Sequence, residues 1–250
     1  MTKDINEEKN FNNFLIVQYT GGAGGRAICS CIQTAENIVP WFKSLPNPVE
    51  FALKHTNDLT HVRSEPDAEY KLPWLSRTYG VERGNDLSKE AVNDLLDENK
   101  DLQQISKGKE YILIDWHKHQ LPKWFEGKCI QIINDPSSVS WLIERRKKLF
   151  YVESEDGVIE TRYDSRYHPR PERNDRRVSN LPLNDLASNQ FEDEDIKVDP
   201  EHHQIQLSWL IAKKWPKIFN VLENAVGGKI DRVWSRTYLD SWHSKVVKNA

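Results

Sequence analysis

The feature that most constrains the fold is a short apolar run that leads through a glycine-rich turn into an amphipathic segment. Residues 14–19 read FLIVQY, a continuous run of β-formers that is typical of a strand buried on both faces of a parallel sheet. GGAGGR follows at residues 21–26, and apolar side chains then recur at helical spacing over residues 26–36. The sequence therefore predicts a strand, a glycine turn and a helix.

The glycine turn has the composition of a phosphate-binding loop. Glycines after a strand permit positive φ and close approach to a ligand, and the first amides of the next helix point outward at the positive end of its dipole. A Walker loop needs lysine followed by serine or threonine, whereas this chain has Arg26 and Ala27. Gly22, Gly24 and Ala27 fit a dinucleotide fingerprint, but a proline-rich loop stands where its second strand is needed. A kinase-type or dinucleotide enzyme is therefore an alternative with part of its motif missing.

Further apolar segments continue the pattern along the chain. Residues 128–133 read as a strand and run straight into a helical segment that Asp135 can cap and Pro136 can open. Because such strands each meet a turn or helix, we expect an α/β fold of three layers, with a mainly parallel central sheet and helices on both faces. The other expected elements are strands over 49–54 and 111–116 and helices over 88–99, 204–225 and 230–248.

Composition restricts the classes of protein and partner. A chain of 250 residues can bury a substantial core in one domain, and Trp209, Trp215, Trp234 and Trp242 are expected to contribute to it. The net charge of -3 gives no global attraction to nucleic acid or to an anionic membrane. The three cysteines show no metal-ligand or disulfide spacing, and no apolar run resembles a signal peptide or a spanning helix. We therefore expect reduced thiols and a cytoplasmic protein.

Two basic segments leave alternatives open. Residues 145–148 read RRKK on the expected helix, and are either a solvated face or a contact for donor phosphate or another polyanion. Residues 162–177 carry six arginines among aromatic side chains within a polar insertion or loop over 154–201. This arginine-rich segment is either a solvated loop or a surface for a protein partner, and nucleic acid is the less favoured partner. Residues 1–13 are expected to be a flexible lead-in to the single domain.

Three segments, in this order, resemble motifs of the sulfotransferase family. GGRA at 24–27 is similar to the KGGTRA loop of carbohydrate sulfotransferases, and ILIDWHKHQLP at 112–122 to a strand that ends near KTHLP. IQIINDPSSVSWL at 131–142 is similar to a strand that runs into RNPxDVxxS. The resemblance covers residues 14–150. It implies a P-loop-like sulfotransferase fold that binds 3′-phosphoadenosine 5′-phosphosulfate (PAPS) as sulfate donor and requires no metal.

The resemblance also implies donor-binding residues. The loop would cradle the 5′-phosphosulfate, with Arg26 supplying the charge of the family's lysine. Asn134 stands where the family has an arginine that contacts the 3′-phosphate, and Leu142 where it has a serine. Arg145 is a further candidate for donor phosphate. The full set of candidate donor-binding residues is Gly21, Gly22, Ala23, Gly24, Gly25, Arg26, Asn134 and Arg145.

Catalysis of sulfuryl transfer needs a base for the acceptor hydroxyl. His119 lies closest to the family's KTHLP histidine, offset by one residue, and His117 fits the other register. Asp115 can orient or replace either histidine. The expected reaction is transfer from PAPS to a hydroxyl of a carbohydrate or other small acceptor. The alternative is a binding or assembly protein that keeps the fold without the donor chemistry, as the missing lysine, arginine and serine suggest.

Overall fold

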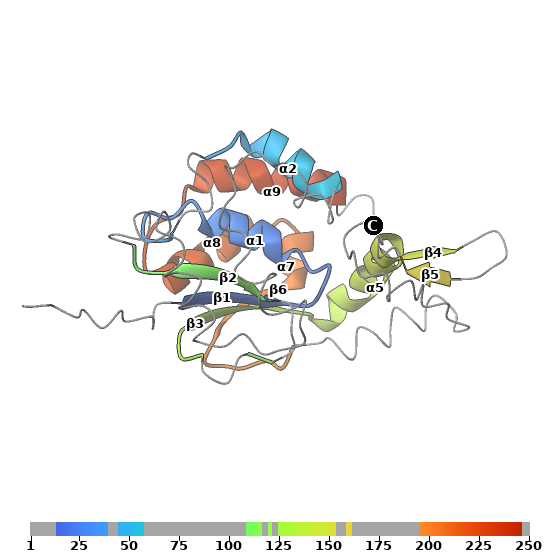
Figure 1. Ribbon diagram of the computed structural model, residues 1–250, viewed down its shortest axis with the longest axis horizontal. Helices are drawn as coiled ribbons and strands as arrows, with labels where there is room; N and C mark the ends of the chain where they lie inside the picture. Colours follow the sequence, from blue (N-terminus) through green and yellow to red (C-terminus); the bar gives the residue numbers. More distant parts are fainter. Residues whose placement is uncertain are drawn as a thin grey trace, which may run out of the picture.

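A computed structural model describes residues 14–39, 45–57, 109–116, 120–121, 125–153, 159–161 and 196–246. Its centre is a sheet of four parallel strands in the order β2-β1-β3-β6 (Figure 1). These strands are β1 (Phe14–Tyr19), β2 (Ile112–Trp116), β3 (Lys128–Ile133) and β6 (His203–Gln206). The α/β class and the parallel sheet predicted from the sequence are therefore confirmed.

Strand β1 occupies the middle of the sheet and is buried along its whole length. All six of its residues are buried, as expected for a strand covered on both faces. Val17 pairs in register with Asp115 of β2 on one side and with Ile130 of β3 on the other. The carboxyl ends of β1, β2 and β3 consequently meet at one edge of the sheet, where open α/β sheets bind ligands.

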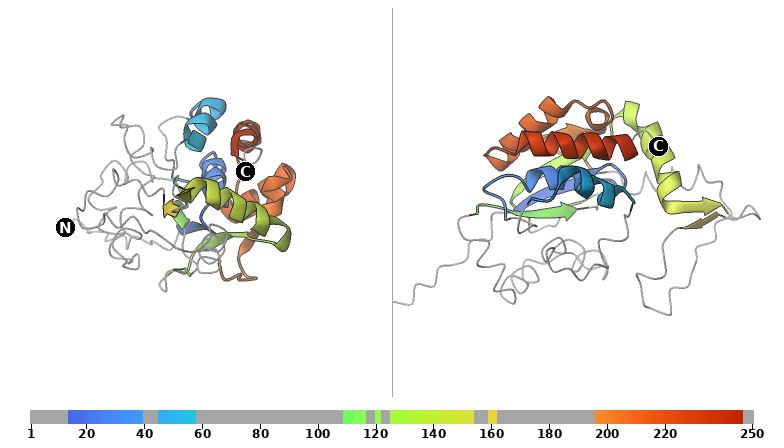
Figure 2. Two further views of the ribbon diagram at one scale, coloured as in Figure 1. Left: turned by 90° about the vertical axis from the view of Figure 1, so that its right-hand side faces the viewer. Right: turned by 90° about the horizontal axis from the view of Figure 1, so that it is seen from above.

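The helices form two layers over one face of the sheet (Figure 1, Figure 2). Next to the strands lie α1 (Gly25–Ile32) and α8 (Trp215–Val226), and beyond them lie α2 (Pro48–Asn57) and α9 (Arg232–Val246). The sequence predicts helices on both faces of the sheet, and in the described part of the chain these helices cover one of the two faces. Trp215, Trp234 and Trp242 are buried in the core between these layers, as predicted, and Trp209 packs against it.

The strand expected over residues 49–54 is wrong, because this segment belongs to helix α2. Asn47 caps the helix: its Oδ1 accepts hydrogen bonds from the amides of Val49 at 3.0 Å and Glu50 at 3.2 Å. Phe51 then packs against Tyr238 of α9, with ring centroids 5.5 Å apart. A proline at the first helical position and a preceding asparagine are a helix start that outweighs the short apolar run.

The helix expected over 204–225 is wrong at its start, which is a strand, and at residues 212–214, where the chain leaves the helical conformation. Residues 203–206 form β6, which pairs with β3, and α7 (Leu207–Ile211) separates this strand from α8. A four-residue strand at a sheet edge is too short to show a period that differs from a helix. The helix expected over 230–248 is confirmed as α9, and its N-cap is Asp231, whose Oδ1 accepts from the amide of Trp234 at 2.9 Å.

Helix α5 (Pro136–Phe150) continues directly from β3, as predicted, and leads into a small hairpin (Figure 1). This hairpin pairs β4 (Tyr151–Glu153) with β5 (Ile159–Thr161) in antiparallel register. The first helix ends at Ile32 rather than near residue 36 because the chain turns there. Expectations that lie outside the described residues are the lead-in 1–13, the helix 88–99, the arginine-rich segment 162–177, and His117 and His119.

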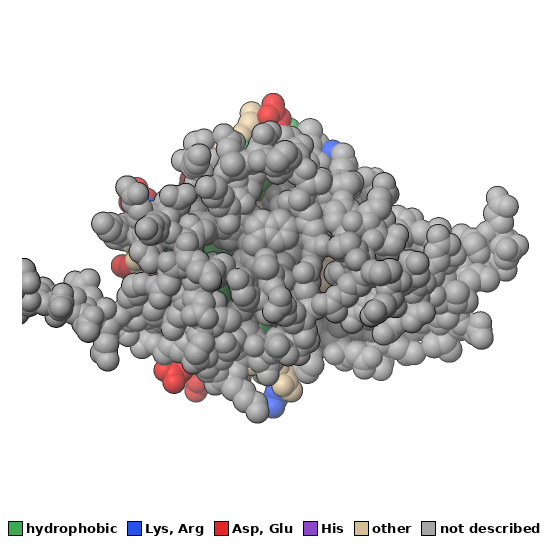
Figure 3. Space-filling model, viewed as in Figure 1, with side chains coloured by type: hydrophobic (Ala, Val, Ile, Leu, Met, Phe, Trp, Pro, Cys, Tyr) green, Lys and Arg blue, Asp and Glu red, His purple; other side chains and the backbone are tan. Residues whose placement is uncertain are grey.

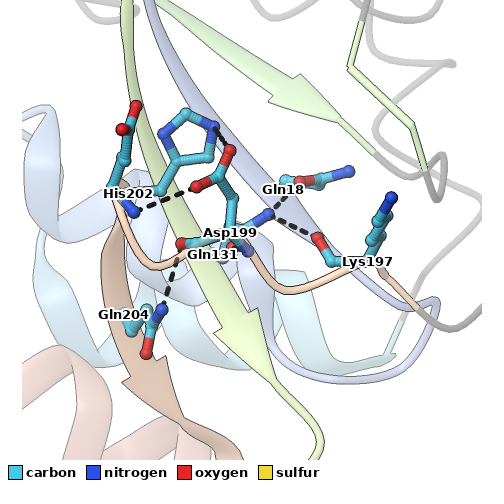
Figure 4. Close-up of polar contacts among 7 residues, drawn as sticks. Gln18, Gln131, Lys197, Asp199, His202 and Gln204 are labelled. Atoms are coloured by element: carbon cyan, nitrogen blue, oxygen red, sulfur yellow. Dashed lines mark hydrogen bonds and ion pairs between the residues drawn. The ribbon is translucent and has the colours of Figure 1, made fainter.

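A buried polar cluster lies on the face of the sheet opposite to these helices (Figure 4). The Nε2 of Gln131 in β3 donates to Oε1 of Gln18 in β1 at 2.8 Å and to the carbonyl of Lys197 at 3.0 Å. Its Oε1 accepts from the amide of Asp199 at 2.9 Å. One buried side chain therefore ties the central strand to the segment that leads into β6.

The described side chains that show at the outline of the molecule in Figure 3 are acidic, basic or otherwise polar. The thiols agree with the expectation from the sequence. Cys29, Cys31 and Cys129 are buried free thiols, and burial raises the pKa of Cys31 and of Cys129 to about 12. No helix within the described ranges has the length and apolar character needed to cross a bilayer.

Candidate anion-binding site at the glycine loop

The glycine loop, residues 21–26, connects the carboxyl end of β1 to the first turn of α1. Gly22 and Gly24 adopt φ of +92° and +84°, which residues with a Cβ rarely adopt. The amide of Ala23 donates to the carbonyl of Thr20 at 3.0 Å and closes the turn. The strand, glycine turn and helix predicted from the sequence are thus confirmed, and the loop lies at the ligand-binding edge of the sheet.

Three glycines of the loop lie against large side chains. A Cβ on Gly25 would come within 1.9 Å of Cδ1 of Tyr19, and one on Gly24 within 2.9 Å of Cζ2 of Trp242. A Cβ on Gly22 would lie 3.3 Å from Cδ1 of Leu142. Helices α5 and α9 therefore pack directly over the loop, and its glycines make this close approach possible.

Arg26 forms an ion pair with Asp115 across the edge of the sheet. Its Nε lies 3.5 Å from Oδ2 of Asp115, and the two side chains are 22% and 7% exposed. Burial acts to lower the pKa of Arg26, but the nearby Asp115 and Tyr19 outweigh it and raise this pKa. Burial and then the Asp115 charge raise the pKa of the Tyr19 phenol well above its usual value. Arg26 therefore stays charged, and Tyr19 beside it stays neutral.

Asn134 joins the end of β3 to the start of the loop. Its Nδ2 donates to Oγ1 of Thr20 at 2.7 Å. Next to it, Oδ2 of Asp135 accepts from the amide of Ser208 at 2.9 Å, so this carboxylate links α5 to α7. Burial acts to raise the pKa of Asp135, but hydrogen bonds from Ser137 and Ser208 outweigh it and lower this pKa. Asp115, the loop and Asn134 are therefore gathered at one edge.

Arg145 and Arg146 are buried, so the solvated-face interpretation is wrong for both. Arg146 is fully buried, and its Cγ is 3.6 Å from where a Cβ on Gly22 would lie. Arg145 is 7% exposed, with its Cζ 5.2 Å from the ring centroid of Trp141 and 5.6 Å from that of Trp242. Burial lowers the pKa of Arg145 to about 9. Helix α5 thus brings cationic side chains toward the glycine loop.

Sequence reasoning missed the contribution of the aromatic side chains to this site. The sequence indicates Tyr19 only as the end of an apolar strand and Trp242 only as a core residue, and in the structure both also line the loop. The spacing of Trp141 and Arg145, one helical turn apart, was the available signal for their contact. In the described ranges, no three His, Cys, Asp or Glu side chains are grouped as metal ligands.

The chain matches no family model, no curated protein and no solved structure. The site is therefore interpreted from its own geometry.

Proposed function

We propose that the chain binds PAPS at the glycine loop and transfers its sulfuryl group to a hydroxyl of a carbohydrate or another small acceptor. The observation that carries this proposal is the meeting of the loop, Arg26 and Asp115 at the carboxyl edge of the sheet. The amides of Gly24, Gly25 and Arg26 donate to no acceptor in the described residues. Amides at the start of a helix that follows a glycine turn favour a phosphate or sulfate group.

Arg26 is suited to hold charge on the transferring group. Its contact with Asp115 runs through Nε, which lies 3.5 Å from Oδ2. A guanidinium fixed at one nitrogen keeps further N–H donors for sulfate oxygens. The ion pair therefore restrains Arg26 while leaving donors that can face the ligand.

Asp115 is the described candidate for the base or for a group that orients it. In the proposed step the acceptor hydroxyl gives its proton to the base, and its oxygen forms a bond to sulfur. The bond from sulfur to the phosphate oxygen of the donor breaks, and 3′-phosphoadenosine 5′-phosphate (PAP) leaves. His117 and His119 follow Asp115 in the chain and lie outside the described residues, so both remain proposed bases beside it.

A second candidate function is binding or assembly without donor chemistry. Trp242 and Leu142 occupy the space next to Gly24 and Gly22, and Arg26 is already paired with a carboxylate. These contacts support the interpretation that the loop has glycines because helices α5 and α9 pack closely against it, and not because it binds a phosphate. The two candidates differ in whether PAP binds.

A thermal-shift titration with PAP tests the proposal. Binding to the folded state stabilises it by about 2.7 kcal/mol at a ligand concentration of 100 Kd, which raises the Tm by several degrees. Arg26→Ala should remove most of this rise, whereas Arg236→Ala, at a 72% exposed arginine of α9, should keep it. No rise with millimolar PAP would reject the donor proposal and leave the binding function. If PAP binds, transfer of radiolabelled sulfate from PAPS tests the reaction.

A further inference from the structure

Three buried donor nitrogens of two side chains on α5 have no hydrogen-bond acceptor among the described residues. They are Nε1 of Trp141 and both Nε and Nη1 of Arg145. The two residues are one helical turn apart, with the guanidinium carbon 5.2 Å from the Trp141 ring centroid. All three groups are donors, and buried donors are almost always paired in folded proteins. Their clustering indicates a missing acceptor rather than three separate exceptions.

The aromatic contacts of Arg145 do not replace that acceptor. Trp141 and Trp242 stabilise the cation through their π-electrons, at distances typical of cation–π pairs. A ring offers no lone pair to a guanidinium N–H group. A buried cation with neither a carboxylate nor a full set of acceptors attracts an anion strongly, because little solvent screens it.

Two carboxylates, Glu144 on the same helix as Arg145 and Asp240 on α9, form contacts with other side chains. Glu144 of α5 contacts Nζ of Lys147 at 2.5 Å. Asp240 of α9 contacts Nζ of Lys213 and accepts from Nε1 of Trp215, each at 3.1 Å. The acceptor that Arg145 lacks is therefore not supplied by these neighbours.

We propose that Trp141, Arg145 and Trp242 form a binding site for an oxyanion of the phosphate or sulfate type. The two indole rings hold the guanidinium, and the N–H groups of Trp141 and Arg145 donate to the anion. The site adjoins the glycine loop, because Trp242 also lies against Gly24. It does not include Arg26 or the loop amides, so it stands whether or not the chain transfers a sulfuryl group.

Thermal-shift titrations with inorganic sulfate, inorganic phosphate and PAP test this site. Each ligand is added at low millimolar concentration with chloride adjusting the ionic strength, because sulfate at high concentration stabilises folded proteins without a site. At least one of the three should stabilise the wild type saturably, and Arg145→Gln should weaken that ligand at least tenfold. Arg236→Gln is the matched control and should bind it normally.

Two further measurements separate binding from packing and from the donor proposal. Without anion, Arg145→Gln should be at least as stable as the wild type, since it removes a buried charge that lacks acceptors. Arg26→Ala should retain the inorganic anion, even if PAP binding is lost. The site is rejected if none of the three ligands stabilises the wild type saturably, or if Arg145→Gln binds all of them as the wild type does.

Discussion

Nε of Arg26 lies 3.5 Å from Oδ2 of Asp115, and this contact joins the first turn of α1 to the carboxyl end of β2. The two residues are distant in the chain, but β1 and β2 pair in parallel and end side by side. Asp115 is almost fully buried, and Arg26 supplies an opposite charge beside it. The pair therefore links the stability of the sheet edge to the position of the candidate donor-binding arginine.

Replacing Asp115 with Asn should destabilise the protein by about 1–3 kcal/mol, because it leaves Arg26 without its opposite charge in a poorly solvated place. Arg26→Gln should cost a similar amount. The double variant should lose less than the sum of the two, and urea unfolding of all four proteins measures this coupling. Strictly additive losses would mean that the ion pair contributes nothing.

Gly25→Ala should be severely destabilising, by about 3 kcal/mol or more, because the new Cβ would come within 1.9 Å of the Tyr19 ring. Gly227→Ala is the matched comparison. Gly227 has φ of +69°, and the nearest neighbour of a Cβ there would be Nζ of Lys128 at an ordinary contact distance of 3.9 Å, so alanine should cost only about 1 kcal/mol. Denaturant midpoints measure both, and equal losses would show that the Tyr19 contact is not tight.

Asp231→Ala should lower stability by about 1 kcal/mol through the loss of the cap of α9. Oδ1 of Asp231 accepts from the amides of Val233 at 3.0 Å and Trp234 at 2.9 Å. Asp231→Asn keeps a capping oxygen and should lose much less. Thermal unfolding of the two variants compares them, and the prediction fails if asparagine is as damaging as alanine.

Glu223 should contribute to stability at neutral pH and lose that contribution in acid. Hydrogen bonds from Arg232, opposed by burial, lower the pKa of Glu223 to about 2. Since the folded pKa lies below the unfolded one, the contribution is complete above about pH 5 and is lost as pH falls toward 2. Its size is about 1 kcal/mol, because Arg232 is 45% exposed.

Glu223→Gln should therefore be less stable than the wild type at pH 7 and nearly equal to it at pH 2.5. Glu201→Gln changes an exposed carboxylate and serves as the control. Urea unfolding across this pH range measures the difference. A gap between Glu223→Gln and the wild type that is the same at both pH values would contradict the shifted pKa.

The central strands were predictable because their residues satisfy one requirement, burial on both faces. FLIVQY and KCIQII have no polar face for a helix or loop to expose, and the structure has them as β1 and β3 with the expected bounds. Residues 48–57 were not predictable in this way. The apolar run there is short, and its helix depends on the Asn47 cap and on packing against α9, which lies far away in sequence.

The candidate site was predictable only in its local part. The glycine loop and its following helix are adjacent in sequence, so their pattern indicated a phosphate-binding turn. The burial of Arg145 between Trp141 and Trp242 depends on how α5 and α9 cross, and a run of four basic residues on one helix does not contain that information. Likewise, pairing of Arg26 with Asp115 requires β1 and β2 to be neighbours.

The central position of β1 has a consequence for synthesis of the chain on the ribosome. Gln18 of β1 bonds to Gln131 of β3, 113 residues later, so this apolar strand is made long before its neighbours. At roughly 5–20 residues per second, β1 waits about 5–20 s for β3 to be translated. During that time its five hydrophobic core residues and Gln18 have no sheet to join. Nascent chains should accordingly depend on chaperones that bind extended apolar segments.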